Sequence, residues 1–383
     1  MNITVYPAPL QGQIEAVSSK SIAHRALICA SFGSRVTKLK LNCISQDIAA
    51  TAECLQQLGG SIMPCEGGYE VTPIAKVPES AILNVRESGS TLRFLLSVVG
   101  ALGVETTFLL SGRLGSRPLS PLWEEMERMG CTLHREENAI YVKGRLRDGV
   151  FRIPGNVSSQ FISGVLLAGF FRKGITVEIT GKLESRYYVD MTKAVIARFQ
   201  SSPPEEVSIE GDWSNAAFFL AANALGSHVT VTGLRADTLQ GDRAVTECLE
   251  KLEAFCTISA ADIPDLIPVL AIVAACKKGA VFADIHRLRL KESDRVQAIV
   301  DMVTALGGRA EAWENTLTIH GTGLTGGTVD SCSDHRIAMA AAIAATVCTE
   351  PVTILNAHAV DKSYPHFWED YRRTGGKYEQ YIR

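Results

Sequence analysis

Apolar residues recur every three to four positions in segments along the chain, and each segment stops at a glycine or a polar turn before two short alternating stretches. The first pattern is typical of an amphipathic helix and the second of a strand pair. This succession occurs six times, which predicts an α/β fold assembled from one repeated module. The stops read LQQLGG (55–60), MERMGC (126–131), IARFQS (196–201), LEKLEA (249–254), VTALGG (303–308) and RRTGGK (372–377).

A complete strand pair is not predicted after every helix stop. TLHREENAIYVKGR (132–145) predicts a hairpin with its turn at 136–138, and RAEAWENTLTIHGTG (309–323) predicts a second one with Glu314–Asn315 in the turn. After the third and fourth stops only short connections follow, SSPPEEVSIEG (201–211) and FCTISAADIP (255–264). We therefore expect units three and four each to lack most of one hairpin.

Basic residues gather at the predicted helix starts. In SSKSIAHRALICASF (18–32) a helix begins at Ser18 or Ser19, where the helix dipole already provides positive charge, so Lys20 and Arg25 are mildly destabilising unless they meet an anion. Several such starts together predict an anion-binding pocket, because helix N-termini also present free N–H groups. The residues concerned are Lys20, Arg25, Arg117, Lys291, Arg295, His335, Arg336 and Lys362, together with the small or polar Gly89, Ser158, Ser159 and Gln160.

Composition narrows the class of protein. The chain has 383 residues, of which 46% are hydrophobic and 21% charged, as expected for a globular protein of two domains. Its net charge of −3 argues against a general nucleic-acid binder, so any basic site must be local. No apolar run reaches the ~18 residues of a membrane span, and the N-terminus lacks the pattern of a signal peptide. We expect a cytoplasmic protein that binds neither membrane nor nucleic acid.

The ten cysteines form no CxxC pair, which favours reduced, buried thiols. The eight histidines show no ligand spacing with cysteines or carboxylates, so neither a metal nor a cofactor is expected.

Ten segments, in order, resemble the motifs of the 5-enolpyruvylshikimate-3-phosphate (EPSP) synthase family. The resemblance extends from near residue 10 to near residue 373. The segments are SSKSIAHRALICASF, ESGSTLRFL, GRLGSRPLSPL, SSQFISGVLLA, ESRYYVDMT, EGDWSNAAFFLAA, LQGD, LRLKESDRV, SDHRIAMA and DKSYPHFWE.

The resemblance implies a pseudo-symmetric enolpyruvyl transferase-like fold, an inside-out α/β barrel in which each of two domains contains three units. The chain is expected to cross between the domains near Val17 and Gly233. The first domain would then comprise residues 1–17 and 234–383, the second residues 18–233, and the active site would lie in the cleft between them.

The implied reaction transfers the enolpyruvyl group of phosphoenolpyruvate to the 5-hydroxyl of shikimate 3-phosphate and releases phosphate. The implied partners are these two small anions, and we expect a monomer. By resemblance, shikimate 3-phosphate is bound by Lys20, Ser21, Arg25, Ser158, Ser159, Gln160, Ser185, Tyr188, Asp265 and Lys291. Phosphoenolpyruvate is bound by Lys20, Gly89, Arg117, Gln160, Arg295, His335, Arg336 and Lys362.

This addition–elimination through a tetrahedral intermediate needs a base for the attacking hydroxyl and an acid for the methylene carbon. Asp265 is the candidate base and Glu292 the candidate acid, with Lys20 and Lys291 as alternatives. A helix cap is the other role open to Asp265, and compensation of a helix dipole is the other role open to Glu292.

Three alternatives share parts of this pattern. The UDP-N-acetylglucosamine enolpyruvyl transferases carry a reactive cysteine in a loop where this chain has Gly112. RNA 3′-phosphate cyclases use similar units but need a nucleotide site, which the sequence does not show. A homologue that binds anions without catalysis is the third alternative, favoured only by the two shortened units.

Overall fold

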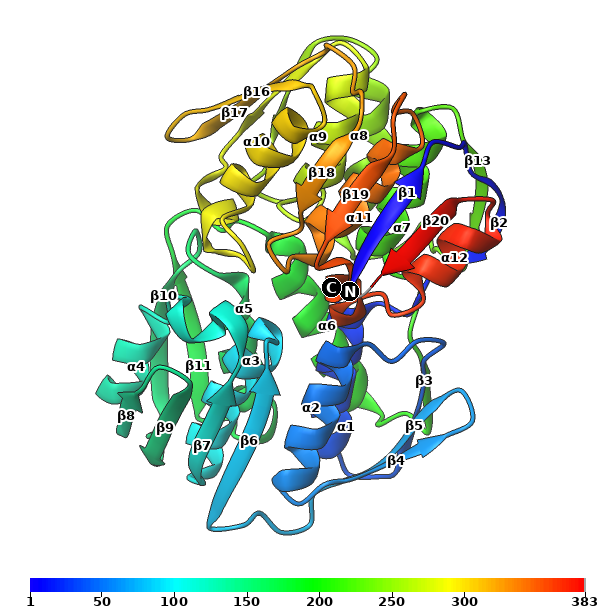
Figure 1. Ribbon diagram of the computed structural model, residues 1–383. Coiled ribbons are helices and arrows are strands. Elements are labelled where there is room, and N and C mark those ends of the chain that lie inside the picture. Colours follow the sequence, from blue (N-terminus) through cyan, green and yellow to red (C-terminus); the bar gives the residue numbers. More distant parts are fainter. Residues whose placement is uncertain (382–383) are drawn as a thin grey trace. The chain divides into compact units, whose positions relative to one another are not determined.

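The computed structural model describes residues 1–381, and the fold consists of helices and mixed sheets (Figure 1). The chain divides into two compact units, one formed by Met1–Val17 with Gly211–Arg383 and one by Ser18–Glu210. We call them unit 1 and unit 2. The first junction coincides with the predicted crossing, whereas the second lies before Gly211 instead of near Gly233.

The earlier junction follows from packing. Helix α7 (Trp213–Ala224) packs against α9 (Ile267–Cys276) and α11 (His335–Ala345), and strand β13 (His228–Thr232) pairs in parallel with β2 (Gln11–Glu15). These contacts place the whole segment after Gly211 in unit 1.

Unit 2 contains α1 (Lys20–Ser31), β3 (Thr37–Lys40), α2 (Gln46–Gln57), β4 (Ser61–Cys65), β5 (Gly68–Thr72), β6 (Ser80–Arg86), α3 (Gly89–Leu102), β7 (Glu105–Leu110), the 3₁₀ helix η1 (Gly112–Ser116), α4 (Leu122–Arg128), β8 (Cys131–Arg135), β9 (Ala139–Gly144), β10 (Gly149–Pro154), α5 (Ser159–Phe171), β11 (Ile175–Thr180), α6 (Arg186–Ser201) and β12 (Glu206–Ser208). Unit 1 contains, besides the elements above, β1 (Asn2–Tyr6), η2 (Gly241–Ala244), α8 (Val245–Lys251), β14 (Cys256–Ser259), β15 (Ala280–Ala283), η3 (His286–Leu290), α10 (Arg295–Ala305), β16 (Arg309–Ala312), β17 (Thr316–His320), β18 (Gly327–Asp330), β19 (Val352–Leu355), η4 (Ala357–Lys362), α12 (Phe367–Arg373) and β20 (Lys377–Tyr381).

Within residues 1–381, four sheets share one topology. Two strands run in parallel, and an antiparallel pair adds to the second of them. This pair is a hairpin in three sheets and is formed by β1 and β20, from opposite ends of the chain, in the fourth. The strand orders are β6-β7-β9-β8, β12-β3-β5-β4, β14-β15-β17-β16 and β18-β19-β1-β20. Both hairpins predicted from the sequence, β8–β9 and β16–β17, have the expected turns.

The remaining two sheets, β10-β11 and β2-β13, consist of the parallel pair alone. They belong to the third and fourth units, so the prediction of two missing hairpins is confirmed. The six repeated units and the mixed α/β class are confirmed as well.

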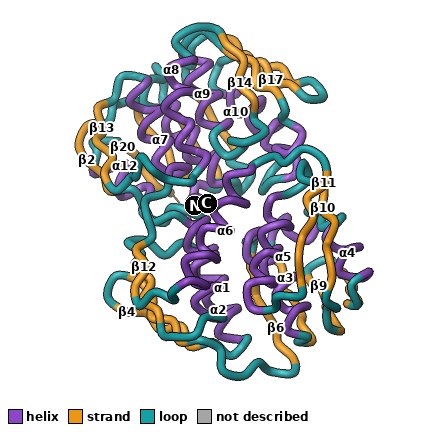
Figure 2. Tube along the Cα trace, turned by 180° about the vertical axis from the view of Figure 1, so that it is seen from behind, coloured by secondary structure: helices purple, strands orange, loops and turns teal. Residues whose placement is uncertain are grey.

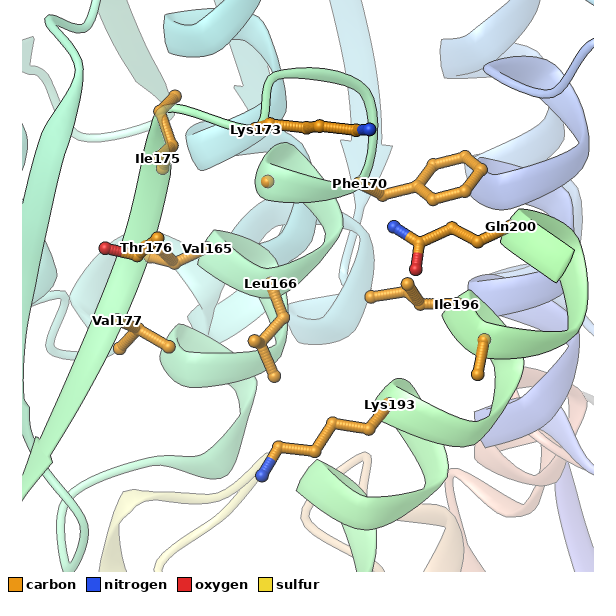
Figure 3. A pocket seen from close by; sticks show the side chains of 12 residues that line it. Val165, Leu166, Phe170, Lys173, Ile175, Thr176, Val177, Lys193, Ile196 and Gln200 are labelled. Carbon is orange, nitrogen blue, oxygen red and sulfur yellow. The ribbon is translucent and has the colours of Figure 1, made fainter.

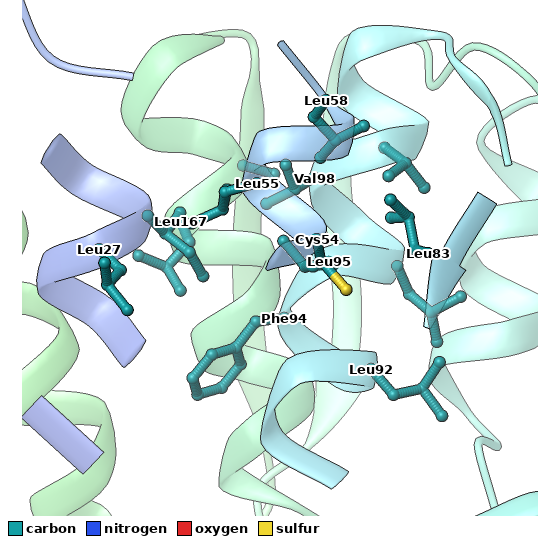
Figure 4. Packing of buried hydrophobic residues seen from close by; sticks show 14 of the residues in the cluster. Leu27, Cys54, Leu55, Leu58, Leu83, Leu92, Phe94, Leu95, Val98 and Leu167 are labelled. Carbon is teal, nitrogen blue, oxygen red and sulfur yellow. The ribbon is translucent and has the colours of Figure 1, made fainter. Parts of the chain in front are cut away.

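The core of unit 2 positions the helix starts discussed below. Figure 2 shows the strands of this unit on its outside and α1, α3 and α5 between them. Leu95 and Val98 of α3 pack with Leu55 of α2 and Leu167 of α5 in one apolar cluster (Figure 4). Across residues 1–381, no helix combines the length and the apolar character needed to cross a bilayer.

Replacing Leu95 by alanine tests this core. Its side chain is 0% exposed, so Leu95→Ala should lower the free energy of unfolding by about 2–5 kcal/mol through lost burial and a residual cavity. Leu109→Ala is the control, because Leu109 is 40% exposed and should cost far less. Denaturant titration measures both, and equal effects would contradict the assignment of α3 to the core.

Candidate active site

In unit 2, Lys20 is the first residue of α1, as predicted, and it is already paired. Its Nζ lies 2.8 Å from Oδ2 of Asp47 on α2. Ser19 occupies the N-cap position, but its side chain caps no backbone N–H. The start of α1 therefore lacks a side-chain cap, and an anion that binds Lys20 must share this ammonium group with Asp47.

Arg25 lies one turn further along and is only 2% exposed. Its Nε donates to Oγ1 of Thr192 at 2.7 Å and its Nη2 to the carbonyl of Tyr188 at 3.1 Å, while the ring of Phe94 covers the guanidinium at 4.9 Å. Burial lowers the pKa of Arg25 to about 10, so the side chain stays charged at neutral pH. Arg25 thus holds the starts of α1 and α6 together.

A donation from Arg25 Nη1 to the Ser21 carbonyl, at 2.6 Å, completes this arrangement on α1. On α6, Ser185 occupies the N-cap position with a left-handed backbone (φ +52°) and is buried. Ser21, Ser185 and Tyr188, which the sequence analysis grouped as ligands of one substrate, therefore belong to two helix starts that Arg25 connects.

The starts of α3 and α5 are joined through Gln160. Its Oε1 accepts from Nη1 of Arg93 at 3.1 Å and its Nε2 donates to Oγ of Ser90 at 2.9 Å. Ser158 is the N-cap of α5 and accepts from the Gln160 N–H, and Ser159 is buried beside it. The sequence analysis missed Arg93 and Ser90, although both lie in the ESGSTLRFL segment.

Gly89 begins α3, as predicted, and Arg117 lies against it. A Cβ on Gly89 would come within 2.7 Å of Arg117 Nη1. The prediction that Arg117 occupies a helix start is wrong, because it follows η1 in an extended conformation and α4 begins only at Leu122. The cis peptide between Ser120 and Pro121 lies in this intervening loop.

In unit 1, a single buried guanidinium gathers three carboxylates. Arg295, which is 1% exposed, donates from Nη1 to Asp265 at 2.5 Å, from Nη2 to Glu292 at 2.7 Å and from Nε to Asp334 at 2.8 Å. Asp265 also lies 3.2 Å from Nζ of Lys291. The candidate base and the candidate acid are therefore held by the same arginine.

The charges of this cluster shift its titration. Burial alone would raise the pKa of Asp265, but the positive charges of Lys291, Arg295 and Arg336 hold it well below its usual value. Burial lowers the pKa of Lys291 in spite of the nearby Asp265 carboxylate. Asp265 is therefore ionised but weakly basic in this arrangement, and Lys291 is easier to deprotonate than an exposed lysine.

Asp334 organises the neighbouring helix start. It is the N-cap of α11, and its Oδ1 accepts from the backbone N–H of Arg336 at 2.9 Å. Arg336 donates from Nη1 to the Ser214 carbonyl at 2.8 Å, and His335 is buried as the first residue of α11. The sequence analysis placed His335 and Arg336 at this helix start but missed Asp334, which caps the helix and binds Arg295.

The helix-start prediction holds for Arg295, His335 and Arg336 but not for two lysines. Arg295 is the first residue of α10, whereas Lys291 lies in the turn between η3 and that helix. Lys362 ends η4 and donates from Nζ to the Ser333 carbonyl at 2.6 Å. Glu292 also precedes Arg295, the first residue of α10, so it does not lie in the first turn of that helix.

Each unit thus carries its own cluster of polar and charged groups at helix starts. Unit 2 supplies four helix starts with hydroxyl groups, an amide and the cations Lys20, Arg25 and Arg117. Unit 1 supplies carboxylates beside Lys291 and Arg295, together with the cations Arg336 and Lys362. Among the described residues no group of three His, Cys, Asp or Glu could hold a metal ion. The fold and these two clusters define a two-unit α/β protein whose helix starts carry groups suited to small anions and carboxylates suited to proton transfer.

Comparison with known proteins gives the family. The model of EPSP synthase (3-phosphoshikimate 1-carboxyvinyltransferase) matches residues 5–263 and 257–371. The chain is similar to the 3-phosphoshikimate 1-carboxyvinyltransferase of Clostridium kluyveri, with 36% identity over 419 aligned positions, 99% of this chain and 98% of that one. The enzyme of the same name from Clostridioides difficile is 33% identical and covers 99% of both chains. The chain belongs to the EPSP synthase family.

A solved structure agrees on the fold. EPSP synthase from Acinetobacter baumannii superposes with a TM-score of 0.78 at 21% identity, over 99% of this chain and 100% of that one. The alignment with the Clostridium kluyveri protein has 419 positions whereas this chain has 383 residues, so that relative contains segments that are absent here.

Replacing Asp334 by asparagine tests the buried cluster. Asp334→Asn leaves Arg295 short of one charge while the side chain keeps its shape, and the free energy of unfolding should fall by about 3–5 kcal/mol. Asp301→Asn is the control, because Asp301 is exposed and should change stability by less than about 0.5 kcal/mol. Denaturant unfolding of both variants is the measurement, and a loss no larger than that of the control would show that Asp334 does not stabilise Arg295.

Proposed function

We propose that this chain transfers the enolpyruvyl group of phosphoenolpyruvate to the 5-hydroxyl of shikimate 3-phosphate and releases phosphate, within the shikimate pathway of aromatic amino acid biosynthesis. Membership of the family over nearly the whole chain carries this proposal. The arrangement of Arg295 with two carboxylates that can exchange protons supports it.

In this proposal unit 2 holds shikimate 3-phosphate. The starts of α5 and α6, with Ser158, Ser159 and Ser185, bind the 3-phosphate, because helix N-termini and hydroxyl groups suit a phosphate. Ser21, Arg25, Gln160 and Tyr188 contact the rest of the molecule, and Lys20 reaches both substrates. Asp265 and Lys291 of unit 1 would complete this site, so the reaction requires the two units to come together on their substrates.

Phosphoenolpyruvate is assigned to the remaining cations. Arginine can bind a carboxylate or phosphate with two parallel hydrogen bonds, which suits Arg117, Arg295 and Arg336. The backbone at Gly89, His335 and Lys362 completes this second set. The pairing of Arg295 with Asp265 and Glu292 means that the substrate anion competes with these carboxylates for one guanidinium.

The proton transfers of the proposed reaction depend on the competition between the substrate anion and the carboxylates for Arg295. The 5-hydroxyl oxygen attacks C2 of phosphoenolpyruvate and loses its proton to Asp265, while C3 gains a proton from Glu292 or Lys20. The tetrahedral intermediate then loses a proton from C3 and the C2–O bond to phosphate breaks. When substrate draws Arg295 away, the pKa of Asp265 rises, and the carboxylate becomes a better base than it is without ligand.

The test of the function is phosphate release. With phosphoenolpyruvate present, the purified chain should release phosphate when shikimate 3-phosphate is added and not when UDP-N-acetylglucosamine is added. Release with the nucleotide sugar alone would establish the related transferase instead. Calorimetric binding of shikimate 3-phosphate without any release would indicate an anion-binding homologue that has lost catalysis.

Asp265→Asn tests the base. The amide cannot accept the proton, so kcat should fall by about 10²-fold or more while the dissociation constant of shikimate 3-phosphate changes little. Asp262→Asn, at an exposed position in the same loop, is the matched control and should keep near-normal turnover. Stopped-time assays give kcat and calorimetry gives the dissociation constant.

The pH profile separates the two candidate bases. A carboxylate base is already ionised at neutral pH, so kcat should gain nothing from its titration there. With Lys291 as the base, kcat would rise with pH, because the neutral fraction of a mostly charged amine grows about tenfold per pH unit. A rising profile that persists in Asp265→Asn and is lost in Lys291→Met would transfer the role to Lys291.

Gly89→Ala tests the phosphoenolpyruvate set. The new methyl would lie 2.6 Å from Arg93 Nη1 and 2.7 Å from Arg117 Nη1, so both guanidinium groups must move. The KM for phosphoenolpyruvate should rise about tenfold, the loss of one charged hydrogen bond, with little change for shikimate 3-phosphate. In an Arg117→Ala background the same substitution should cost less than in the unchanged protein, because only the clash with Arg93 remains. Additive effects would mean that Gly89 acts independently of Arg117.

A further inference from the structure

The four complete units show how a hairpin is seated in this fold. In each of them the first helix of the unit packs against the inner hairpin strand and the second helix against the outer strand. We call the hairpin's binding surface the seat. It consists of the second parallel strand, whose edge pairs with the hairpin, and of the two helices that pack against the hairpin strands. The corresponding contacts are α3 with β9 and α4 with β8, α1 with β5 and α2 with β4, α9 with β17 and α10 with β16, and α11 with β1 and α12 with β20.

The third unit has this seat without a hairpin in it. After α6 the chain passes directly to β12, which pairs with β3 in another sheet. A groove of about 820 Å³ lies where the hairpin would pack, between β11, α5 and α6 (Figure 3). Its apolar wall is formed by Val165, Leu166, Phe170, Ile175, Val177 and Ile196.

The edge of β11 offers backbone groups to a further strand. The carbonyls of Gly174 and Thr180 accept hydrogen bonds from Gly149 and Gly155 beside β10. Because the peptide groups of a strand alternate in direction, those of Val177 and Ile179 face the opposite edge. No strand of residues 1–381 pairs with that edge. In the four complete units, the equivalent edge accepts an antiparallel strand.

Two lysines give the groove its charge. Lys173 precedes β11 and Lys193 lies on α6, and their side chains are at opposite ends of the groove (Figure 3). Both residues are exposed, and within the described part of the chain neither forms an ion pair. An occupant with acidic side chains would be matched to this pair of charges.

A second copy of the chain fits this seat poorly. Its own open strands, β11 and β13, carry helices α5 and α7 on the face that would have to enter the groove. If the edge of β11 paired with β11 or β13 of a second copy, the helix that covers that strand would overlap the helices that line the groove. The groove can accept only a strand whose apolar face is not covered by a helix.

We propose that the groove between β11, α5 and α6 binds an extended peptide segment of another protein, in which apolar and acidic residues alternate, as an antiparallel strand added to β11. The apolar side chains of the segment replace those of the missing hairpin, and its carboxylates pair with Lys173 and Lys193. Main-chain hydrogen bonds supply affinity, and the alternating side chains supply specificity.

The probe is a nine-residue capped peptide in which valine and glutamate alternate, added to the full-length chain. Fluorescence anisotropy should show saturable binding, and hydrogen exchange should slow at the amides of Val177 and Ile179. Lys193→Glu should weaken binding about threefold or more by removing one rim ion pair, whereas Lys278→Glu, at an exposed lysine outside the groove, should not. Val177→Pro removes an edge N–H and should abolish protection of the edge.

Reversing the charges of the groove and of the peptide together separates an effect on binding from an effect on folding. The double variant Lys173→Glu with Lys193→Glu should prefer a peptide in which valine and lysine alternate. Absence of binding at millimolar glutamate peptide, or binding that Lys193→Glu and Val177→Pro leave unchanged, would overturn the proposal. So would sedimentation that shows a dimer of the chain alone which Val177→Pro dissociates, because a second copy would then occupy the seat. Phosphate release serves as the check that each variant is folded, since none of these residues belongs to the proposed reaction site.

Discussion

Positive charge placed at the positive ends of helices is the constraint on which this structure depends. Such a charge is unfavourable unless an anion lies beside it, and the protein supplies its own anions. Asp47 pairs with Lys20 at the start of α1, and Asp334 pairs with Arg295 at the start of α10. Internal carboxylates therefore keep these helix starts in shape. In the proposed reaction the same pairing would make substrate binding an exchange, in which a phosphate or carboxylate of the ligand replaces a carboxylate of the protein.

This exchange connects binding with proton transfer. Arg295 depresses the pKa of Asp265 only while it stays beside it. In the proposed reaction, Asp265 would become the stronger base when the substrate anion occupies Arg295, and it would stay ionised without substrate. Glu292, which shares the same guanidinium, would be released by the same event. One buried arginine would then coordinate two carboxylates that need opposite protonation states during the reaction.

Much of the fold could be predicted from the sequence because the repeated unit carries a strong local signal. The six helix stops and the turns at 136–138 and 314–315 are set by neighbouring residues, so the repeat and the two missing hairpins were predicted correctly. The second junction at Gly211 depends on how α7 packs against distant helices, which local pattern does not contain. Arg117 and Lys291 were misplaced for a similar reason, since each directly follows a 3₁₀ helix and a short loop separates it from the next α-helix. The links from Arg93 to Gln160 and from Asp334 to Arg295 join residues far apart in the chain and required the structure.

The loss of a hairpin from the third unit leaves the proposed substrate residues of that unit in place, and the geometry of α5 and α6 explains why. Ser158, Ser159 and Ser185 occupy the first positions of these helices, where Arg25 and Gln160 connect them to α1 and α3. The groove begins at Val165 on α5 and at Lys193 on α6, at least one turn further along each helix. The hairpin seat and the helix starts are therefore supported by different contacts. A repeat can lose its outer strands at one end of its helices while the ends that bind anions stay fixed by their neighbours.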